Sequence, residues 1–309
     1  MSVLGIDTSN YTTSAAVCRA DGTGRNESRL LTVRPGELGL RQSEALFQHV
    51  KRLPERLAAL EAEGWLTDLK AVGASTRPRP VEGSYMPCFL AGESLGKSLS
   101  HALGVPFFPF SHQEGHIAAA CWSAGRPELM DRPLLAWHLS GGTTELLLVT
   151  PNGPGFRAEC IGGTTDISAG QLIDRTGQRL ALDFPAGKAL DALALRSGSE
   201  DSFPVKHRDL HFSLSGMENQ VQRRIEAGQA PEDVARFVLN TLARLLCRVT
   251  EAALNDHPGL PVLCSGGVAS NRLLRERLTG AVFAEPRYST DNAMGIALLT
   301  RRALEYTFL

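Results

Sequence analysis

The sequence predicts an α/β protein built from two strand-rich units of the same kind. A strand, a small polar turn and a second strand occur at residues 3–18, and the same order returns at residues 134–149. The length of 309 residues is also more than one hydrophobic core usually serves. We therefore expect two domains, formed by residues 1–128 and 129–309.

The first domain is expected to combine strands with amphipathic helices. Leucine and valine side chains recur at helical spacing between residues 43 and 62, which predicts an amphipathic helix there. The other expected elements are strands at 3–9, 14–18, 30–33, 69–74 and 105–110, a helix at 89–103, and a helix that Ser111 caps and that runs through Cys121.

The second domain is expected to be richer in helix. Its first two strands flank a turn of glycine, serine and threonine, as in the first domain. The expected elements are strands at 134–139, 145–149 and 261–264, a mostly helical stretch at 165–254 that a loop at 197–210 interrupts, and a helix that contains Leu273, Leu274 and Leu278.

Composition indicates an ordinary globular protein. Hydrophobic residues make up 43% of the chain and charged residues 21%, which excludes a disordered or fibrous chain. The formal net charge of −1 gives no global signal for nucleic-acid binding, so any RNA contact must come from local patches. Candidate arginines for such contacts, which in most proteins belong to solvated helix faces, are Arg223, Arg224, Arg272, Arg275 and Arg277.

Cysteine usage and the N-terminal residues indicate a reducing compartment. The six cysteines include no C-x-x-C pair, which is typical of reduced, buried thiols rather than of a disulfide framework. Residues 1–10 show no basic stretch followed by an apolar one, and no apolar run is long enough to cross a bilayer. We therefore expect a soluble, cytoplasmic protein without membrane contact.

Three turns rich in glycine or hydroxyl side chains follow strands, at residues 7–13, 140–144 and 265–271. Small side chains let backbone N–H groups point at an anion, and hydroxyls add further donors. A single turn of this kind is weak evidence, because turns favour glycine and serine for backbone reasons alone. Together the three predict a site for a polyphosphate and a nucleoside, although the sequence has neither a Walker loop nor a dinucleotide fingerprint.

A candidate metal site is formed by His112 and His116, which lie four residues apart in a predicted helix. Chance gives roughly 0.2 such pairs in a chain with this many histidines, so two solvent-facing histidines are the alternative. Asp291 opens the last predicted helix, where it serves either as a cap or as a third ligand. A zinc protease is disfavoured because Gln113 follows the first histidine and Glu114 comes one position too late.

Another candidate carboxylate is Asp174. Asp166, Gly170 and Asp174 fall on one side of a predicted helix start. Either this side is a polar solvent face, or Asp174 accepts hydrogen bonds from a ribose, because a carboxylate suits a vicinal diol.

Seven segments, taken in order, carry a resemblance to a known family. They are Gly5–Ser9, Leu95–His116, Ser140–Thr144, Asp183–Gly187, Phe212–Gly216, Gly266–Arg272 and Thr290–Ala293. This ordered set, which spans nearly the whole chain, resembles the tRNA threonylcarbamoyladenosine transferases of the actin-like ATPase superfamily. The resemblance implies an α/β fold of two actin-like, ribonuclease H-like lobes with an inter-lobe cleft.

The resemblance also implies an activity and its ligands. The reaction is the metal-dependent transfer of threonylcarbamoyl from threonylcarbamoyl-AMP to N6 of adenosine 37, in tRNAs that read codons starting with A. One Fe²⁺ or Zn²⁺ per subunit is implied at His112, His116 and Asp291, while no catalytic residue is assigned. The implied partners are tRNA, a paralogous actin-like subunit and a small ATPase. The residues implied to bind ATP or threonylcarbamoyl-AMP are His138, Leu139, Ser140, Gly141, Gly142, Asp174, Gly187 and Asn271.

Four positions depart from the family's motifs. Tyr11 and Thr12 replace an Asp-Glu pair, Thr143 replaces a histidine, and Gln171 replaces a glutamate. They motivate an alternative, a divergent paralogue that binds nucleotide and metal but serves another carbamoyl acceptor or a regulatory role. A small-molecule kinase on the same fold is a third hypothesis, which requires a catalytic aspartate beside the acceptor hydroxyl.

Overall fold

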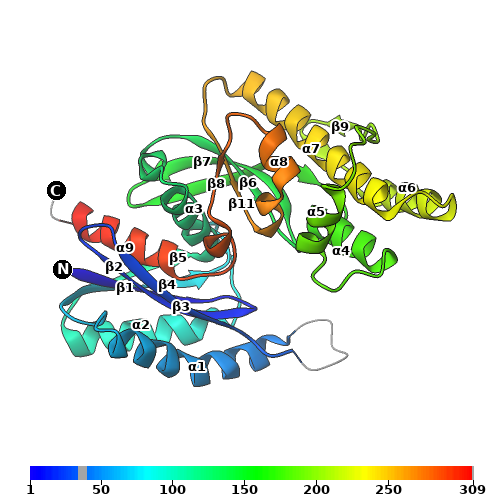
Figure 1. The fold of residues 1–309 in the computed structure, drawn as a ribbon. Helices are drawn as coiled ribbons and strands as arrows, with labels where there is room; N and C mark the ends of the chain where they lie inside the picture. The colour runs from blue at the N-terminus through cyan, green and yellow to red at the C-terminus, as the bar shows by residue number, and fades with distance from the viewer. Residues whose placement is uncertain (34–39, 308–309) are drawn as a thin grey trace. The chain divides into compact units, whose positions relative to one another are not determined.

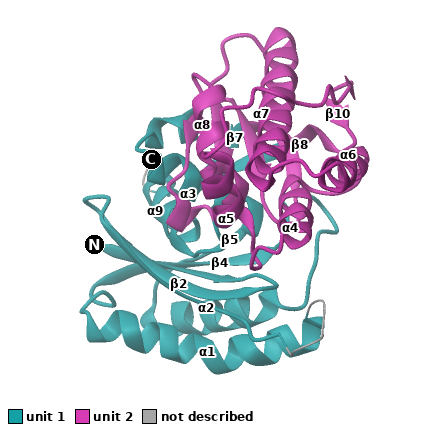
Figure 2. Cartoon of the chain, turned by 45° about the vertical axis from the view of Figure 1, so that its right-hand side comes forward, with its two compact units in different colours: residues 1–132, 150–158, 290–309 teal, residues 133–149, 159–289 magenta. Residues whose placement is uncertain are grey.

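Two sheets, each with its own helices, organise the chain into two units. The computed structural model describes residues 1–33 and 40–307. Figure 2 shows the two units, of which unit 1 contains the N-terminal sheet and unit 2 the second sheet. Unit 1 comprises residues 1–132, 150–158 and 290–309, and unit 2 comprises residues 133–149 and 159–289.

The sheet of unit 1 has the strand order β3-β2-β1-β4-β5. Strand β1 pairs antiparallel with β2, as the predicted hairpin requires, and parallel with β4. All seven residues of β1 are buried, because helices cover both faces of the sheet at its centre. The strands are β1 (Ser2–Thr8), β2 (Thr12–Arg19), β3 (Gly24–Leu30), β4 (Leu69–Arg77) and β5 (Phe107–Ser111).

Two helices lie on each face of this sheet. Helices α1 and α2 cover one face, and α3 and α9 cover the other (Figure 1). The predicted helix at 89–103 is confirmed to the residue, and the one from residue 43 begins one position earlier. The helical segments are α1 (Gln42–Ala62), α2 (Phe89–Leu103), α3 (His112–Ser123), the 3₁₀ turn η1 (Pro127–Asp131) and α9 (Met294–Tyr306).

Two predictions for the first domain are wrong. The third strand occupies residues 24–30 rather than 30–33, because this edge strand consists mainly of charged and polar residues and carries no apolar run. The predicted division at residue 128 assigns residues 290–309 to the second domain. In the structure these residues belong to unit 1, because the apolar side of α9 packs on β1, β2 and β4.

The sheet of unit 2 has the strand order β12-β11-β6-β7-β8-β10-β9. The predicted hairpin forms between β6 and β7, and β11 pairs parallel with β6. Strand β8 is not predicted by the sequence, because the middle of the strand is exposed and lacks regular alternation. The strands are β6 (Leu134–Leu139), β7 (Thr144–Asn152), β8 (Gly155–Thr164), β9 (His207–Arg208), β10 (His211–Phe212), β11 (Val262–Ser265) and β12 (Val282–Phe283).

Helix α7 (Pro231–Asp256) forms the main apolar support of this second sheet. Its buried residues pack in one cluster with Leu135, Trp137 and Leu146 of the sheet. The indole Nε1–H of Trp137 donates to Thr250 Oγ1 at 2.9 Å, so its polar atom is satisfied inside the core. The other helical segments are α4 (Ala169–Arg179), α5 (Gly187–Ala194), α6 (Ser215–Glu226), η2 (Gly267–Ser270), α8 (Arg272–Arg277) and η3 (Pro286–Tyr288).

The cysteines are free, as predicted, but they are not all buried. Cys160 is exposed and Cys247 is half-buried, whereas the other four are buried. Within residues 1–33 and 40–307, no helix combines the length and the apolar character that a membrane span requires.

The buried tryptophan gives a test of the unit 2 core. Trp137→Phe removes the indole N–H and leaves a void beside Thr250, so we expect the free energy of unfolding to fall by about 2 kcal/mol. The matched control is Trp65→Phe in unit 1, where the side chain is half-exposed and its loss is expected to cost under about 1 kcal/mol. Urea denaturation followed by circular dichroism measures both, and equal costs would contradict the assignment of Trp137 to the core.

Candidate functional site

The start of α3 is fixed by a capping box. Ser111 Oγ accepts from the backbone N–H of Glu114, and Glu114 Oε2 accepts from the backbone N–H of Ser111 at 2.7 Å. The second carboxylate oxygen of Glu114 accepts from the N–H of Phe156 at 3.1 Å, which ties the helix start to the start of β8. The backbone of His112, the first residue of α3, is therefore positioned by the helix cap and by the contact of Glu114 with Phe156.

Three side chains converge in unit 1. The Nε2 atoms of His112 and His116 face each other at 2.9 Å, and their rings meet edge to face. Asp291 Oδ1 lies 3.5 Å from His112 Nε2 and 3.3 Å from His116 Nε2. One donor atom from each residue lies within 4.8 Å of the other two, the proximity that a single metal ion needs. The structure thus brings together the three residues that the sequence singled out.

Two further side chains orient this group. His112 Nδ1 lies 2.9 Å from Asp7 Oδ1, and Asp7 is only 1% exposed. An ionised carboxylate only accepts, so Nδ1 carries a proton, and a lone pair becomes available at Nε2 when the ring loses its second proton. Ser9 Oγ donates to Asp291 Oδ2 at 2.7 Å, which leaves Oδ1 toward the imidazoles. Asp7 Oδ2 is buried and has no hydrogen-bond partner among the described residues.

A close contact between two glycines places Asp291 beside the histidines. Gly115 lies in α3 between the two histidines, and Gly295 lies in the first turn of α9. A Cβ on Gly295 would lie 1.8 Å from the carbonyl oxygen of Gly115 and 2.9 Å from its Cα. Only glycine permits this approach of the two backbones.

The secondary structure around Asp291 differs from the prediction in one respect. The residue neither follows a strand directly nor caps the last helix, because η3 precedes it and α9 begins at Met294 with Ala293 at the N-cap. Its carboxylate is therefore not used by the helix start and is available to the histidine pair.

Neighbouring charges shift the pKa values of His112 and Asp291. Burial acts to lower the pKa of His112, but the carboxylates of Asp7 and Asp291 outweigh it and raise this pKa well above its ordinary value. Burial acts to raise the pKa of Asp291, and hydrogen bonds and charge from His112 and His116 lower it well below its ordinary value. Without a cation the cluster is thus an imidazolium–carboxylate pair.

Unit 2 contains a separate pocket. Its volume is about 480 Å³, within the range of small-molecule sites. The pocket is formed by the turn after β6, by α4, by the start of α5 and by the segment from η2 to α8. Its lining includes four residues that the family resemblance implies, namely Gly141, Asp174, Gly187 and Asn271.

Three polar side chains of the pocket are held in defined orientations. Asp174 Oδ1 accepts from the backbone N–H of Ala186 at 2.8 Å. Asn271 Oδ1 accepts from the N–H of Leu274 and so caps α8, while its Nδ2 donates to Asp191 Oδ1 at 2.7 Å. Burial raises the pKa of Asp191. Asp191 is not among the residues predicted from the sequence, although it lies one helical turn after Gly187 on the same face of α5.

The turn between β6 and β7 is packed against the start of α4. Ser168 Oγ donates to the carbonyl of Gly141 at 2.7 Å, and a Cβ on Gly170 would lie 2.5 Å from Gly141 Cα. Gly170 therefore serves close packing rather than the polar helix face that was the alternative. Asp166 lies before α4 and accepts from the backbone N–H groups of Leu214 and Ser215, so it holds the start of α6.

The remaining residues implied for nucleotide binding lie in β6 or in the turn after it. Leu139 is fully buried in the core, so only its backbone is available to a ligand. His138 is half-buried in β6, Ser140 accepts from the N–H of Thr143 at 3.0 Å, and Gly142 is exposed in the turn. None of these four lines the pocket of about 480 Å³.

Four of the five candidate arginines have polar partners within the chain. Arg275 donates to the carbonyls of Ala269 and Ala284, Arg224 pairs with Asp201, and Arg277 pairs with Glu200. Arg223 is exposed. Arg272 lines the pocket, where its Nε lies 3.7 Å from Asp191 Oδ2.

Comparison with known proteins identifies the family. The model of the tRNA N6-adenosine threonylcarbamoyltransferase family matches residues 36–298. The chain belongs to this family. A member of that name from Thermus thermophilus is 34% identical over 313 residues, covering 98% of this chain and 93% of the relative. One from Chloroherpeton thalassium is 30% identical over 340 residues, covering 99% and 93%.

Solved structures with the same fold are more distant in sequence. Full-length HypF, in a phosphate- and nucleotide-bound form, gives a TM-score of 0.61 at 14% identity and covers 98% of this chain and 47% of HypF. The activator of 2-hydroxyisocaproyl-CoA dehydratase from Clostridium difficile, with bound ADPNP, gives 0.56 at 14% identity and covers 100% and 97%. These likenesses confirm the actin-like α/β fold, while the cleft between its lobes stays a prediction.

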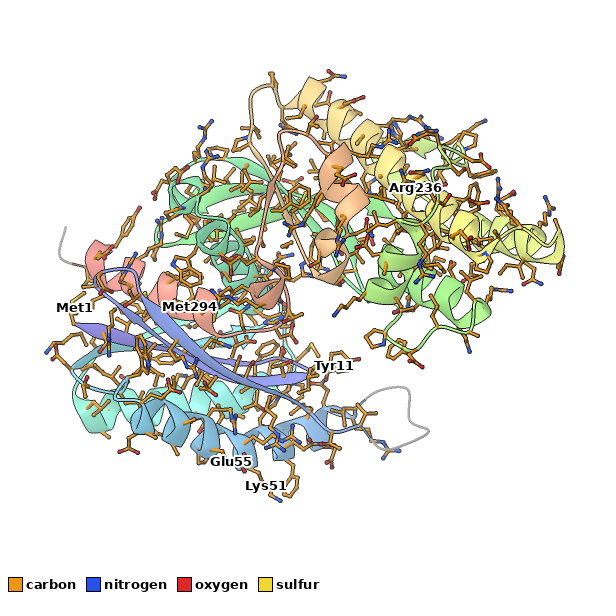
Figure 3. All side chains as sticks on the ribbon, in the orientation of Figure 1. Met1, Tyr11, Lys51, Glu55, Arg236 and Met294 are labelled. Carbon is orange, nitrogen blue, oxygen red and sulfur yellow. The ribbon has the colours of Figure 1, made fainter. Side chains whose placement is uncertain are left out.

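The structure gives the positions of the four departures from the transferase motifs and a side-chain role for Gln171. Gln171 completes the capping box of α4, a position where glutamine and glutamate serve equally. Thr12 is buried in β2, and the backbone N–H of Thr143 is held by Ser140. Tyr11 is half-exposed in the turn that joins β1 to β2 (Figure 3).

The glycine contact gives a test of how the site is built. Gly295→Ala forces α9 away from α3, so we expect a loss of about 1–3 kcal/mol in stability and a weaker hold on any metal ion. Gly216→Ala is the control, because a Cβ there meets no atom within 4 Å at the start of α6. Thermal unfolding and metal content measure both effects, and an unimpaired Gly295→Ala protein would show that the two helices need not touch.

Proposed function

We propose that the protein transfers threonylcarbamoyl from threonylcarbamoyl-AMP to N6 of adenosine 37 in tRNAs that read codons starting with A. The observation that carries this proposal is the convergence of His112, His116 and Asp291 in a chain of the tRNA N6-adenosine threonylcarbamoyltransferase family. No comparison favours the alternative of a divergent paralogue with another acceptor.

His112, His116 and Asp291 are the proposed ligands of one Fe²⁺ or Zn²⁺. The residues fit such an ion because two imidazole nitrogens and one carboxylate oxygen face one another, and because Asp7 and Ser9 orient the first and the last of them. Two histidines and one carboxylate also leave coordination positions open. When bound, the ion would supply Lewis acidity and orient phosphate or carbamate oxygens.

The pocket of unit 2 is the proposed site of the adenylate part of the donor, or of ATP. Asp174 is suited to the ribose hydroxyls, because its carboxylate is held by Ala186 and an anionic oxygen binds a diol well. The residues His138, Leu139, Ser140, Gly141 and Gly142, at the end of β6 and in the turn after it, are the proposed phosphate segment, of which Gly141 lines the pocket together with Gly187 and Asn271. Lys188 and Arg272 add positive charge to the lining.

The proposed reaction needs positioning more than acid–base chemistry. A bond forms between N6 of the adenosine and the carbamoyl carbon, the bond from that carbon to the phosphate oxygen breaks, and AMP leaves with the electron pair. The amine loses one proton, for which we assign no catalytic residue. The chain's contribution is to bind and orient the donor and to exclude water from the acyl group.

The proposed partners follow from the family. They are tRNA, a paralogous actin-like subunit and a small ATPase, and a tRNA substrate places the reaction in the cytoplasm. The candidate arginines for a tRNA phosphate are Arg223, which is exposed, and Arg272, which is the most exposed of those that form an ion pair.

The central test joins metal content to activity. In His116→Ala and Asp291→Asn we expect metal content per chain to fall to near zero, and the transfer rate to adenosine in tRNA to fall at least 100-fold, because the ligand set is incomplete. The assay supplies threonylcarbamoyl-AMP and unmodified tRNA, with nucleoside analysis as the readout. His101→Ala, an exposed histidine in α2, is the control. Full transfer by a protein without metal would overturn the proposal.

Metal binding is expected to depend on pH in a defined direction. The raised pKa of His112 means that the metal-free site holds a proton at neutral pH, and this proton must leave before Nε2 can bind a metal. The apparent affinity should therefore rise about tenfold per pH unit from the ordinary histidine value, about 6.5, up to the raised pKa.

Calorimetric titration of Zn²⁺ in buffers of different ionisation enthalpy measures the protons released. A pH-independent affinity, with no proton release, would contradict the protonated state of the free site.

A further inference from the structure

A buried histidine outside the proposed ligand set lies beneath the first turn of unit 1. His49, on α1, has 0% of its surface exposed. Its Nε2 lies 2.8 Å from the carbonyl oxygen of Ser9, and its Nδ1 lies 2.8 Å from Thr13 Oγ1. Ser9 and Thr13 lie on either side of the connection between β1 and β2, so the ring of His49 joins its two sides.

These contacts define the protonation state of His49. A carbonyl oxygen only accepts, so Nε2 carries the proton and Nδ1 accepts from the hydroxyl of Thr13. Burial lowers the pKa of His49, which keeps the ring neutral at pH 7. Because both ring nitrogens are engaged, His49 has no lone pair for a metal and no proton to exchange with a substrate. Its contribution must be structural.

The contact with Ser9 leads directly to the metal site. The backbone of Ser9 is held by His49, and its hydroxyl donates to Asp291 Oδ2 at 2.7 Å. Asp291 Oδ1 is the oxygen that faces the imidazoles at 3.3 and 3.5 Å. A fixed Ser9 hydroxyl therefore selects which oxygen Asp291 presents and at which angle.

Burying the polar ring of His49 costs free energy, which its hydrogen bonds to the turn must offset. The other buried residues of α1 are Ala45, Leu53 and Leu60, and they pack in apolar clusters against the sheet and its covering helices. An apolar residue at position 49 would satisfy the same helix face without desolvating a polar ring. The two hydrogen bonds to the turn are therefore the interactions that favour an imidazole over an apolar side chain at this position.

We propose that His49 is a positioning residue of the metal centre, which acts through Ser9 to orient the carboxylate of Asp291. The inference rests on the proposed metal site. Helix α1 contributes no proposed ligand, but through His49 and Ser9 it would influence how tightly the site holds a divalent cation.

The test uses two substitutions that each imitate one ring nitrogen. Glutamine places its amide N–H near the position of Nε2 and retains the donor to Ser9, whereas asparagine imitates Nδ1 and retains only the contact with Thr13. We expect His49→Ala and His49→Asn to weaken Co²⁺ binding at least tenfold and to alter the visible spectrum of the bound ion. His49→Gln should restore both to near the wild-type values.

The control separates positioning from stability. Leu53→Ala lies one turn further along α1 and is equally buried, so it lowers the free energy of unfolding without touching the turn. Its Co²⁺ affinity and spectrum are expected to match those of the wild type. All variants are full-length chains stripped of metal with a chelator and titrated with Co²⁺.

A double-mutant cycle tests the route through Ser9. In a Ser9→Ala background the hydroxyl that reaches Asp291 is absent, so His49→Asn should cause little further loss of Co²⁺ affinity. Additive losses would overturn the proposed route. Equal affinity of His49→Asn and wild type, together with Co²⁺ binding by the wild type, would overturn the role of His49 alone. If the wild type binds no Co²⁺, the metal centre itself is wrong and this inference falls with it.

Discussion

The contact between Gly115 of α3 and Gly295 of α9 is the constraint on which the proposed metal site depends. At Gly295 the two helices approach until backbone meets backbone, so that a Cβ there would overlap the carbonyl of Gly115. One helix carries both histidines, and the other begins just after Asp291. The distances among the three donor atoms therefore follow from how closely two helices can pack, rather than from flexible side chains that search for one another.

The residues around the site are also held by backbone that strands and helix ends fix in position. The first turn, with Asp7 and Ser9, extends from a central strand that helices cover on both faces. The capping box of Glu114 fixes the first turn of α3. His112 and Asp291 are thus held by Asp7 and Ser9, which lie in β1 and directly after it, and such rigid support keeps metal sites selective.

Sequence analysis found the elements with strong periodic or capping signals. The helix at 89–103, the cap at Ser111 and the pair of histidines all depend on residues close in the chain, where spacing alone carries the information. Asp174 and Asn271 were implied by motifs, and the structure places both at one pocket. What local spacing could not show were contacts between distant segments, such as Asp191 with Asn271 or Glu114 with Phe156.

The return of α9 to the first sheet has a consequence for synthesis. Residues 290–309 belong to unit 1, although about 150 residues of unit 2 separate them from the rest of that sheet's helices. On the ribosome the two histidines therefore emerge well before Asp291. A nascent chain cannot complete the proposed cation-binding set until this later segment has been translated.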